Sequence, residues 1–247
     1  LRPHVGDTIR LRMDQDVEVV ATSRMRGRDS TYRMQRHLTV HSRSIIERAD
    51  AAGAVVLAVT DSAVVRDGSA PPRRTMAGGS IQFHVAPDGA TRVMDGGGML
   101  TPEASALVAQ MPATLPKGEL EIGDSWRHAV QVPIPGLPTG APTGTLIATF
   151  RLDSLSRYGD VAYVSMRGSL ARPAGGVALP QGGRYESTGT VIGQLEVDRR
   201  RGWLTGMRAT VSVRSVLTPP PGVDAAPMHV STLVKQWLRS VDAVDKR

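Results

Sequence analysis

The sequence contains no cysteine among its 247 residues. This absence excludes disulfide bonds, thiolate nucleophiles and zinc sites that use cysteine. It agrees with a periplasmic or cell-envelope location, where many bacterial proteins lack cysteine. An export segment or an N-terminal lipid anchor would have to lie outside the sequence given.

Aromatic residues are scarce at 4%, so a core must be built from Val, Leu, Ile, Ala and Met within a hydrophobic content of 40%. The longest apolar run, Ala51–Val59, is far shorter than the ~20 residues that cross a bilayer as a helix. Almost all of the 30 basic residues are arginine, and the net charge is +7. Arginines without interleaved aromatics argue against nucleic-acid binding, whereas contact with an anionic membrane surface stays open.

What the sequence does contain is long runs in which apolar and polar residues alternate with a period of two. From Thr8 to Val20 one face is apolar and the other polar, which predicts a long, half-buried strand. The run from Tyr32 to Arg43 alternates in the same way, and Gly27 lies between the two runs, so we expect an antiparallel hairpin. Arg36 falls on the apolar face, where we expect it at an edge or paired. The apolar face of the first run comprises Ile9, Leu11, Met13, Val17 and Val19, and its polar face carries Asp14, Asp16 and Glu18.

Further strands are predicted along the whole chain. Hairpins are expected at residues 81–94, 146–169 and 190–213, and residues 228–238 form a last strand or short helix. Thr101-Pro102-Glu103 has the hydroxyl, proline and carboxylate of a helix start, which predicts a covering helix at about residues 101–111.

The chain reads as two similar halves, residues 1–112 and 113–247, that form one continuous domain. Gly6-Asp7-Thr8 opens the first half and Gly123-Asp124-Ser125 the second, each at the start of a strand. The predicted fold class is therefore mainly β. We expect a large antiparallel curved sheet, as a half-barrel or a sandwich, with the one short helix covering it.

The stretch Leu120-Glu121-Ile122-Gly123-Asp124-Ser125-Trp126, with the β-rich run that ends near Gly202-Trp203-Leu204, resembles uncharacterised bacterial envelope proteins of the DUF6263 type. The resemblance covers most of the chain and implies no catalytic residues. More distantly, long curved strands with a covering helix look like the half-barrels of periplasmic lipoprotein carriers, a likeness of architecture alone.

Three patterns could carry chemistry, and each has a plainer interpretation. Gly123-Asp124-Ser125 is similar to the nucleophile context of GDS-type esterases, but no Asp-x-x-His follows near the end, and a turn explains both copies. His37 and His41 would lie about 13 Å apart on a strand, too far to share a metal ion. Asp14, Asp16 and Glu18 are better explained as a solvated face than as a calcium cage. We therefore predict a non-enzymatic protein without metal or cofactor.

Two sets of residues are candidates for binding. The apolar set would line a concave sheet face that holds an apolar ligand or lipid: Leu11, Met13, Met34, Val211 and Val213. The basic set would contact anions or partners from two turns: Arg24, Arg26, Arg28, Arg199, Arg200 and Arg201. Two other roles stay open, an accessory subunit docked on a larger membrane-protein assembly and a secreted serine hydrolase that uses Ser125.

Overall fold

A computed structural model describes residues 3–25, 28–75, 78–95, 115–116, 118–132, 144–171, 176–179 and 182–241. Within these ranges the chain forms thirteen strands and no helix. The strands are β1 (Thr8–Met25), β2 (Arg28–Asp50), β3 (Gly53–Asp67), β4 (Arg73–Thr75), β5 (Ser80–Val85), β6 (Thr91–Asp95), β7 (Ser125–Val132), β8 (Gly144–Leu155), β9 (Val161–Ala171), β10 (Val177–Ala178), β11 (Arg184–Asp198), β12 (Trp203–Thr218) and β13 (Met228–Ser240).

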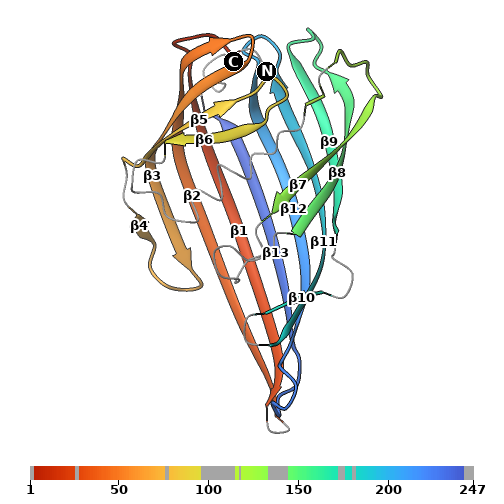
Figure 1. Cartoon of the computed structure of the whole chain (residues 1–247). Helices are drawn as coiled ribbons and strands as arrows, with labels where there is room; N and C mark the ends of the chain where they lie inside the picture. The colour runs from red at the N-terminus through yellow and green to blue at the C-terminus, as the bar shows by residue number, and fades with distance from the viewer. Residues whose placement is uncertain are drawn as a thin grey trace.

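All the strands belong to one open antiparallel sheet, curved along its width (Figure 1). Its main path runs β6-β5-β3-β2-β1-β13-β12-β11-β9-β8-β7, while β4 and β10 pair at the sides with β3 and β11. The first and last strands therefore meet in the middle, where Leu11 pairs with Ser240 and Thr22 with His229. The prediction of a large antiparallel sheet is confirmed, whereas a sandwich is wrong because the strands form one sheet.

The sheet is much wider at one end than at the other (Figure 1). At the wide end β1 begins and β13 stops, and both termini of the chain lie there. At the narrow end β1 turns into β2 beyond the pair Met25 and Arg28. At about 3.3 Å per residue, the 18 residues of β1 span roughly 60 Å between the two ends.

The predicted hairpins are present, since β1 pairs with β2, β5 with β6, β8 with β9 and β11 with β12. Residues 228–238, left open between strand and helix, lie in β13. The helix predicted at about 101–111 lies outside the described residues. In the parts of the chain that are described, no helix is long and apolar enough to cross a membrane.

Most buried side chains gather on one face of the sheet, here called the inner face. It carries Ile9, Leu11 and Met13, which are 1–5% exposed. Directly opposite residues in an antiparallel pair point to the same face, so the register extends the inner face from β1 to both neighbours. The opposite, outer face carries the polar residues of each strand, beginning with Arg10, Arg12 and Asp14. The two faces follow directly from the alternation in the sequence.

Candidate functional site: the inner sheet face

The register places all five predicted apolar residues on the inner face. Met13 pairs with Leu238, and Leu238 pairs with Met207. Further toward the narrow end, a single row crosses four strands as Val213, Thr232, Val19 and Met34. The next row toward the wide end holds Val211, Val234, Val17 and, on β2, Arg36.

Burial divides the inner face into two parts. Near the wide end Leu11 and Met13 are 4% and 5% exposed, within a core that also contains Val56 and Phe150, both fully buried. Phe150 stacks on Trp126, with 5.8 Å between the ring centroids. Along the narrow half Met34, Val211 and Val213 are only half-buried. The wide half is thus a packed core, and the rows of Val211 and Val213 are partly accessible, whereas Tyr185, Ser187 and Ser215 beyond them toward the narrow end are buried again.

In the described ranges the register places two cations on the inner face, Arg36 of β2 and Arg73 of β4, and Arg36 is paired as expected. Its Nε donates to Asp67 Oδ1 at 2.7 Å, and Arg73 binds the other carboxylate oxygen. The hydrogen bond from Arg36 lowers the pKa of Asp67 and, with that from Arg73, outweighs the opposing effect of desolvation. Arg36 is therefore held at the side of the face, where β2 meets β3.

Polar side chains also lie among the buried residues, and two of them were not predicted from the sequence. Gln236 Nε2 donates to Met13 Sδ at 3.2 Å. Trp203 Nε1 and Ser240 Oγ are buried, yet neither has a hydrogen-bond partner in the structure described here. Trp203 is 4% exposed and belongs to the same buried cluster as Leu195 and Met207. No local pattern marks these two residues, because their burial depends on pairing between distant strands.

The two basic turns do not form a common site. Arg24 and Arg28 lie at the narrow end and Arg199 to Arg201 at the wide end, at opposite ends of the sheet. Arg26 lies outside the described residues. Arg24 pairs with Asp29 at 3.5 Å.

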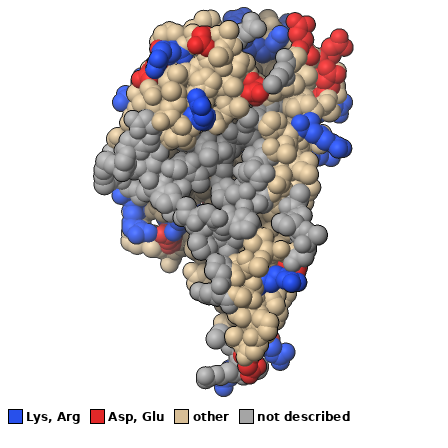
Figure 2. Space-filling model, viewed as in Figure 1, with Lys and Arg blue, Asp and Glu red and all other residues tan. Residues whose placement is uncertain are grey.

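The residues of the turn from Arg199 to Arg201 form their hydrogen bonds and ion pairs mainly with Asp198 and with the adjacent turn at Gly159 and Asp160. Arg200 Nε lies 3.0 Å from Asp160 Oδ1, and Arg199 Nη1 donates to the carbonyl of Gly159. Asp198 Oδ1 accepts the backbone N–H groups of Arg200 and Arg201. Figure 2 shows basic and acidic side chains interspersed over the wide end of the visible face. Anion binding by these turns stays a prediction.

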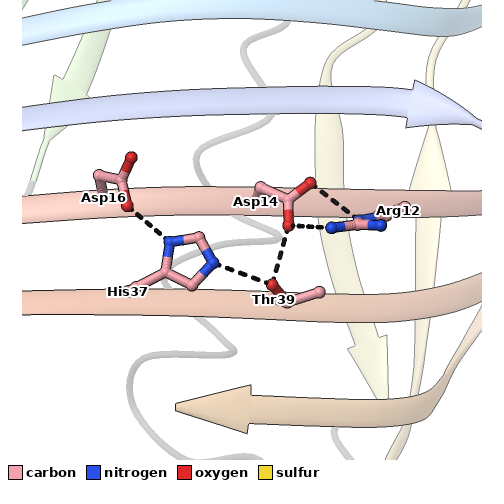
Figure 3. Close-up of polar contacts among 5 residues, drawn as sticks. All are labelled: Arg12, Asp14, Asp16, His37 and Thr39. Carbon is pink, nitrogen blue, oxygen red and sulfur yellow. Dashed lines mark hydrogen bonds and ion pairs between the residues drawn. The ribbon is translucent and has the colours of Figure 1, made fainter. Parts of the chain in front are cut away.

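The outer face of β1 and β2 carries charged pairs. Arg33 Nε lies 3.3 Å from Glu18 Oε1, whereas Arg43 pairs with Asp61 of β3 rather than with an acid of β1. His37 Nδ1 lies 2.6 Å from Asp16 Oδ1, so this histidine is engaged across the strands (Figure 3). In the described ranges no three His, Asp or Glu side chains converge as a metal ion would require.

Asp14 is the centre of this outer network (Figure 3). Arg12 donates two hydrogen bonds to its carboxylate, at 2.9 and 3.0 Å, and Thr39 Oγ1 donates a third at 2.8 Å. Partial burial raises the pKa of Asp14, but these hydrogen bonds and the charges of Arg12 and His37 outweigh it, so the pKa lies below its ordinary value. The network holds β1 against β2 and lies on the face opposite the apolar rows.

The two Gly-Asp motifs form turns at strand starts. Gly6 and Gly123 have φ angles of 87° and 103°, and each donates its N–H to a neighbouring strand, to Ile46 and Leu152 respectively. Ser125 is exposed and lies opposite Arg151. The turn interpretation accounts for both motifs, and the register places no histidine opposite Ser125.

Searches of family models and of curated proteins find no match to the sequence. The resemblance to the DUF6263 type therefore stays a prediction.

Several solved structures are weakly similar over most of their length. Pseudomonas aeruginosa OccK2, solved with glucuronate, has 6% identity and a TM-score of 0.27, covering 97% of this chain and 98% of its own. A lipoprotein-sorting protein domain from Vibrio parahaemolyticus has 9% identity and a TM-score of 0.16, covering 94% and 87%. A DUF1329 family protein from Desulfovibrio piger has 11% identity, the same TM-score and the same coverage. Likeness this low carries no conclusion about function.

Proposed function

We propose that this protein binds a lipid or similar long apolar molecule on its inner face, without catalysing a reaction and without a cofactor. The observation that carries the proposal is the half-buried apolar surface of the narrow half, where Met34, Val211 and Val213 lie beside Val17 and Val19. Apolar rows of this extent are left accessible in few water-soluble sheets unless something covers them.

The shape of this surface suits an extended chain rather than a compact molecule. The rows of Val211 and Val213 follow one another along the strands, so their apolar contacts lie along the sheet axis, and the next row toward the narrow end contains Ser215 and Val230. Each methylene that is removed from water contributes about 0.8 kcal/mol, and an acyl chain laid along these strands would gain several kcal/mol. On the outer face Trp237 lies opposite Asp14 and Ile192 opposite Arg167, so its exposed apolar side chains stand among charged ones.

The proposed compartment is the periplasm or another part of the cell envelope, where acyl lipids must be shielded from water as they move between membranes. Subcellular fractionation of the source cells tests this part of the proposal separately. Recovery in the cytosolic fraction alone would contradict it.

Native mass spectrometry of the protein purified from its source tests binding directly. We expect a mass excess that matches one or two lipids and disappears after extraction with organic solvent. The stripped protein should then take up a fluorescent phospholipid from vesicles. Stoichiometric partner subunits without lipid would instead favour the role of an accessory subunit.

A further inference from the structure

Three cations surround an exposed tryptophan on the outer face of β12 and β13. Trp237 is 37% exposed, and Arg208 lies directly opposite it on β12. Lys235 and Arg239 lie two residues before and after Trp237 in β13, so they share its face. All three cations are exposed. These four residues are here called the cationic patch.

The acids of β1 that face this patch are engaged elsewhere. Asp14 lies opposite Trp237, and Asp16 lies opposite Lys235. In the described part of the chain, the side-chain hydrogen bonds of both carboxylates go to residues of β1 and β2, and none goes to β13 (Figure 3). The negative charges next to the patch are therefore turned away from it.

The three cations consequently lack partners of opposite charge. Within the described ranges Arg208, Lys235 and Arg239 form no ion pair. Glu196, which lies beside them on the outer face of β11, forms none either, and the residue of β1 opposite Arg239 is another cation, Arg12. Cations that are gathered on one face without counter-charges create a positive potential, which attracts a surface of opposite sign.

The composition of the patch favours a lipid surface over a protein or a nucleic acid. Tryptophan is enriched where proteins meet the membrane–water interface, because its ring is apolar and its N–H can donate a hydrogen bond. Each lysine or arginine near an anionic bilayer strengthens binding about fivefold. A stable protein interface has an apolar core, whereas Trp237 stands among charges. Single-stranded nucleic acid is bound by several stacking aromatics, and the patch has one.

We propose that the cationic patch docks the protein on the surface of an anionic phospholipid bilayer. Trp237 lies at the level of the headgroups in the docked protein, and the three cations contact lipid phosphates. This inference goes beyond the proposed function, because the patch is on the face opposite the apolar rows and can act whether or not those rows hold a lipid.

Cosedimentation with vesicles tests docking directly. The two vesicle types are pure phosphatidylcholine and an equal mixture of phosphatidylcholine and phosphatidylglycerol. At a salt concentration of about 0.1 M we expect at least tenfold tighter binding to the mixed vesicles. Most of this difference should vanish at about 1 M salt, because the Debye length falls from about 10 Å to about 3 Å.

A triple variant assigns the binding to the patch. With Arg208→Gln, Lys235→Gln and Arg239→Gln combined, binding to the mixed vesicles should weaken at least tenfold. A matched control loses the same charge at three exposed positions outside the patch and should bind within about twofold of the parent. The control combines the glutamine substitutions at Arg74, Arg92 and Arg157.

A variant that gains affinity keeps the test independent of folding. Gln194 of β11 is exposed and lies opposite Arg208. Gln194→Lys adds a cation at the margin of the patch and should bind the mixed vesicles about fivefold more tightly than the parent. A misfolded variant would not show this increase together with the same dependence on salt.

The fluorescence of Trp237 reports its position. Mixed vesicles that carry a spin label on the headgroup should quench the tryptophan fluorescence of the parent, and most of this quenching should be lost in Trp237→Phe. The other two tryptophans are more shielded, since Trp203 is 4% exposed and Trp126 is half-buried and stacked on Phe150.

Equal binding to both vesicle types, an equal loss in the triple variant and its control, or unchanged quenching in Trp237→Phe would overturn the docking surface. Binding of an acidic protein or a nucleic acid without binding of vesicles would overturn it as well. The proposed function is tested apart from this: copurified lipid in the triple variant supports it even where docking is lost, and docking of a parent that holds no lipid contradicts it.

Discussion

Asp7 and Asp124, which are 117 positions apart, make the same set of hydrogen bonds. The carboxylate of Asp7 accepts the N–H of His4, and that of Asp124 accepts the N–H of Glu121. Their carbonyls accept the N–H groups of Ile46 and Leu152, at 2.9 and 3.0 Å. Each aspartate thus closes a tight turn and joins it to the neighbouring strand, which explains why both motifs contain Gly-Asp.

Alanine at the turn glycines should destabilise both turns to a similar extent. Gly6 and Gly123 have left-handed φ angles, and a Cβ would meet no atom within 4 Å at either position. The cost is therefore conformational, and we expect Gly6→Ala and Gly123→Ala to lower the free energy of unfolding by about 1–2 kcal/mol each. Urea unfolding measures this. Gly118→Ala, in open space without a left-handed φ, is the control and should stay within about 0.5 kcal/mol of the parent.

Replacing Asp14 should lower stability at neutral pH and make little difference in strong acid. Its folded-state pKa is lowered, so the carboxylate stabilises the folded state above about pH 4, and this contribution is lost as the pH falls through the lowered pKa. We expect Asp14→Asn to cost roughly 1 kcal/mol at pH 7 and almost nothing at about pH 2.

The control for this experiment is Asp61→Asn, whose ion pair with Arg43 is longer, at 3.4 Å, and more exposed. Its effect at pH 7 should be smaller than that of Asp14→Asn. A cost for Asp14→Asn that is the same at both pH values would contradict the assigned hydrogen bonds.

A charge on the inner face should abolish lipid uptake, whereas the same charge on the outer face should not. Val213 and Ser212 are adjacent in β12 and point to opposite faces. We expect Val213→Lys to reduce transfer of a fluorescent phospholipid from vesicles at least tenfold, because a cation in an apolar contact must be desolvated. Ser212→Lys should transfer lipid like the parent. If both variants transfer the phospholipid equally well, the lipid does not bind at Val213.

A side chain at Gly168 should disturb a crowded part of the sheet. A Cβ on this residue of β9 would lie 2.7 Å from the Ile147 carbonyl oxygen and 3.0 Å from Ala148 Cα, both backbone atoms. Backbone cannot rotate out of the way, so Gly168→Ala should cost about 1–3 kcal/mol in urea unfolding. Ser169→Ala, next to it and exposed, should be near neutral. A neutral Gly168→Ala would mean that the strands can move apart here.

Much of this fold is visible in the sequence because the signal is local. The alternation from Thr8 onward predicts both the strand and its buried face, and Leu11 and Met13 are indeed buried. Gly27 between two alternating runs predicts the hairpin of β1 and β2. Such patterns need only the period of a strand and the preferences of turn residues.

The other features depend on contacts between distant parts of the chain, which no local pattern contains. Alternation does not reveal that Leu11 pairs with Ser240, nor that Trp203 is buried without a partner. The sequence also does not predict which part of the inner face is fully buried. Met13 and Val213 both lie on the apolar face of an alternating run, yet Met13 is buried and Val213 is only half-buried. Whether two similar halves arose by duplication stays a prediction.

The seam between β1 and β13 sets the order in which this sheet can be completed. During synthesis β1 and β2 can pair as soon as both are made, but β13, the partner for the other edge of β1, follows all the other described strands. Until then β1 offers a long row of unpaired backbone groups to any strand that passes. A chaperone that holds extended segments until β13 is made would therefore protect the edge of β1 from mispairing.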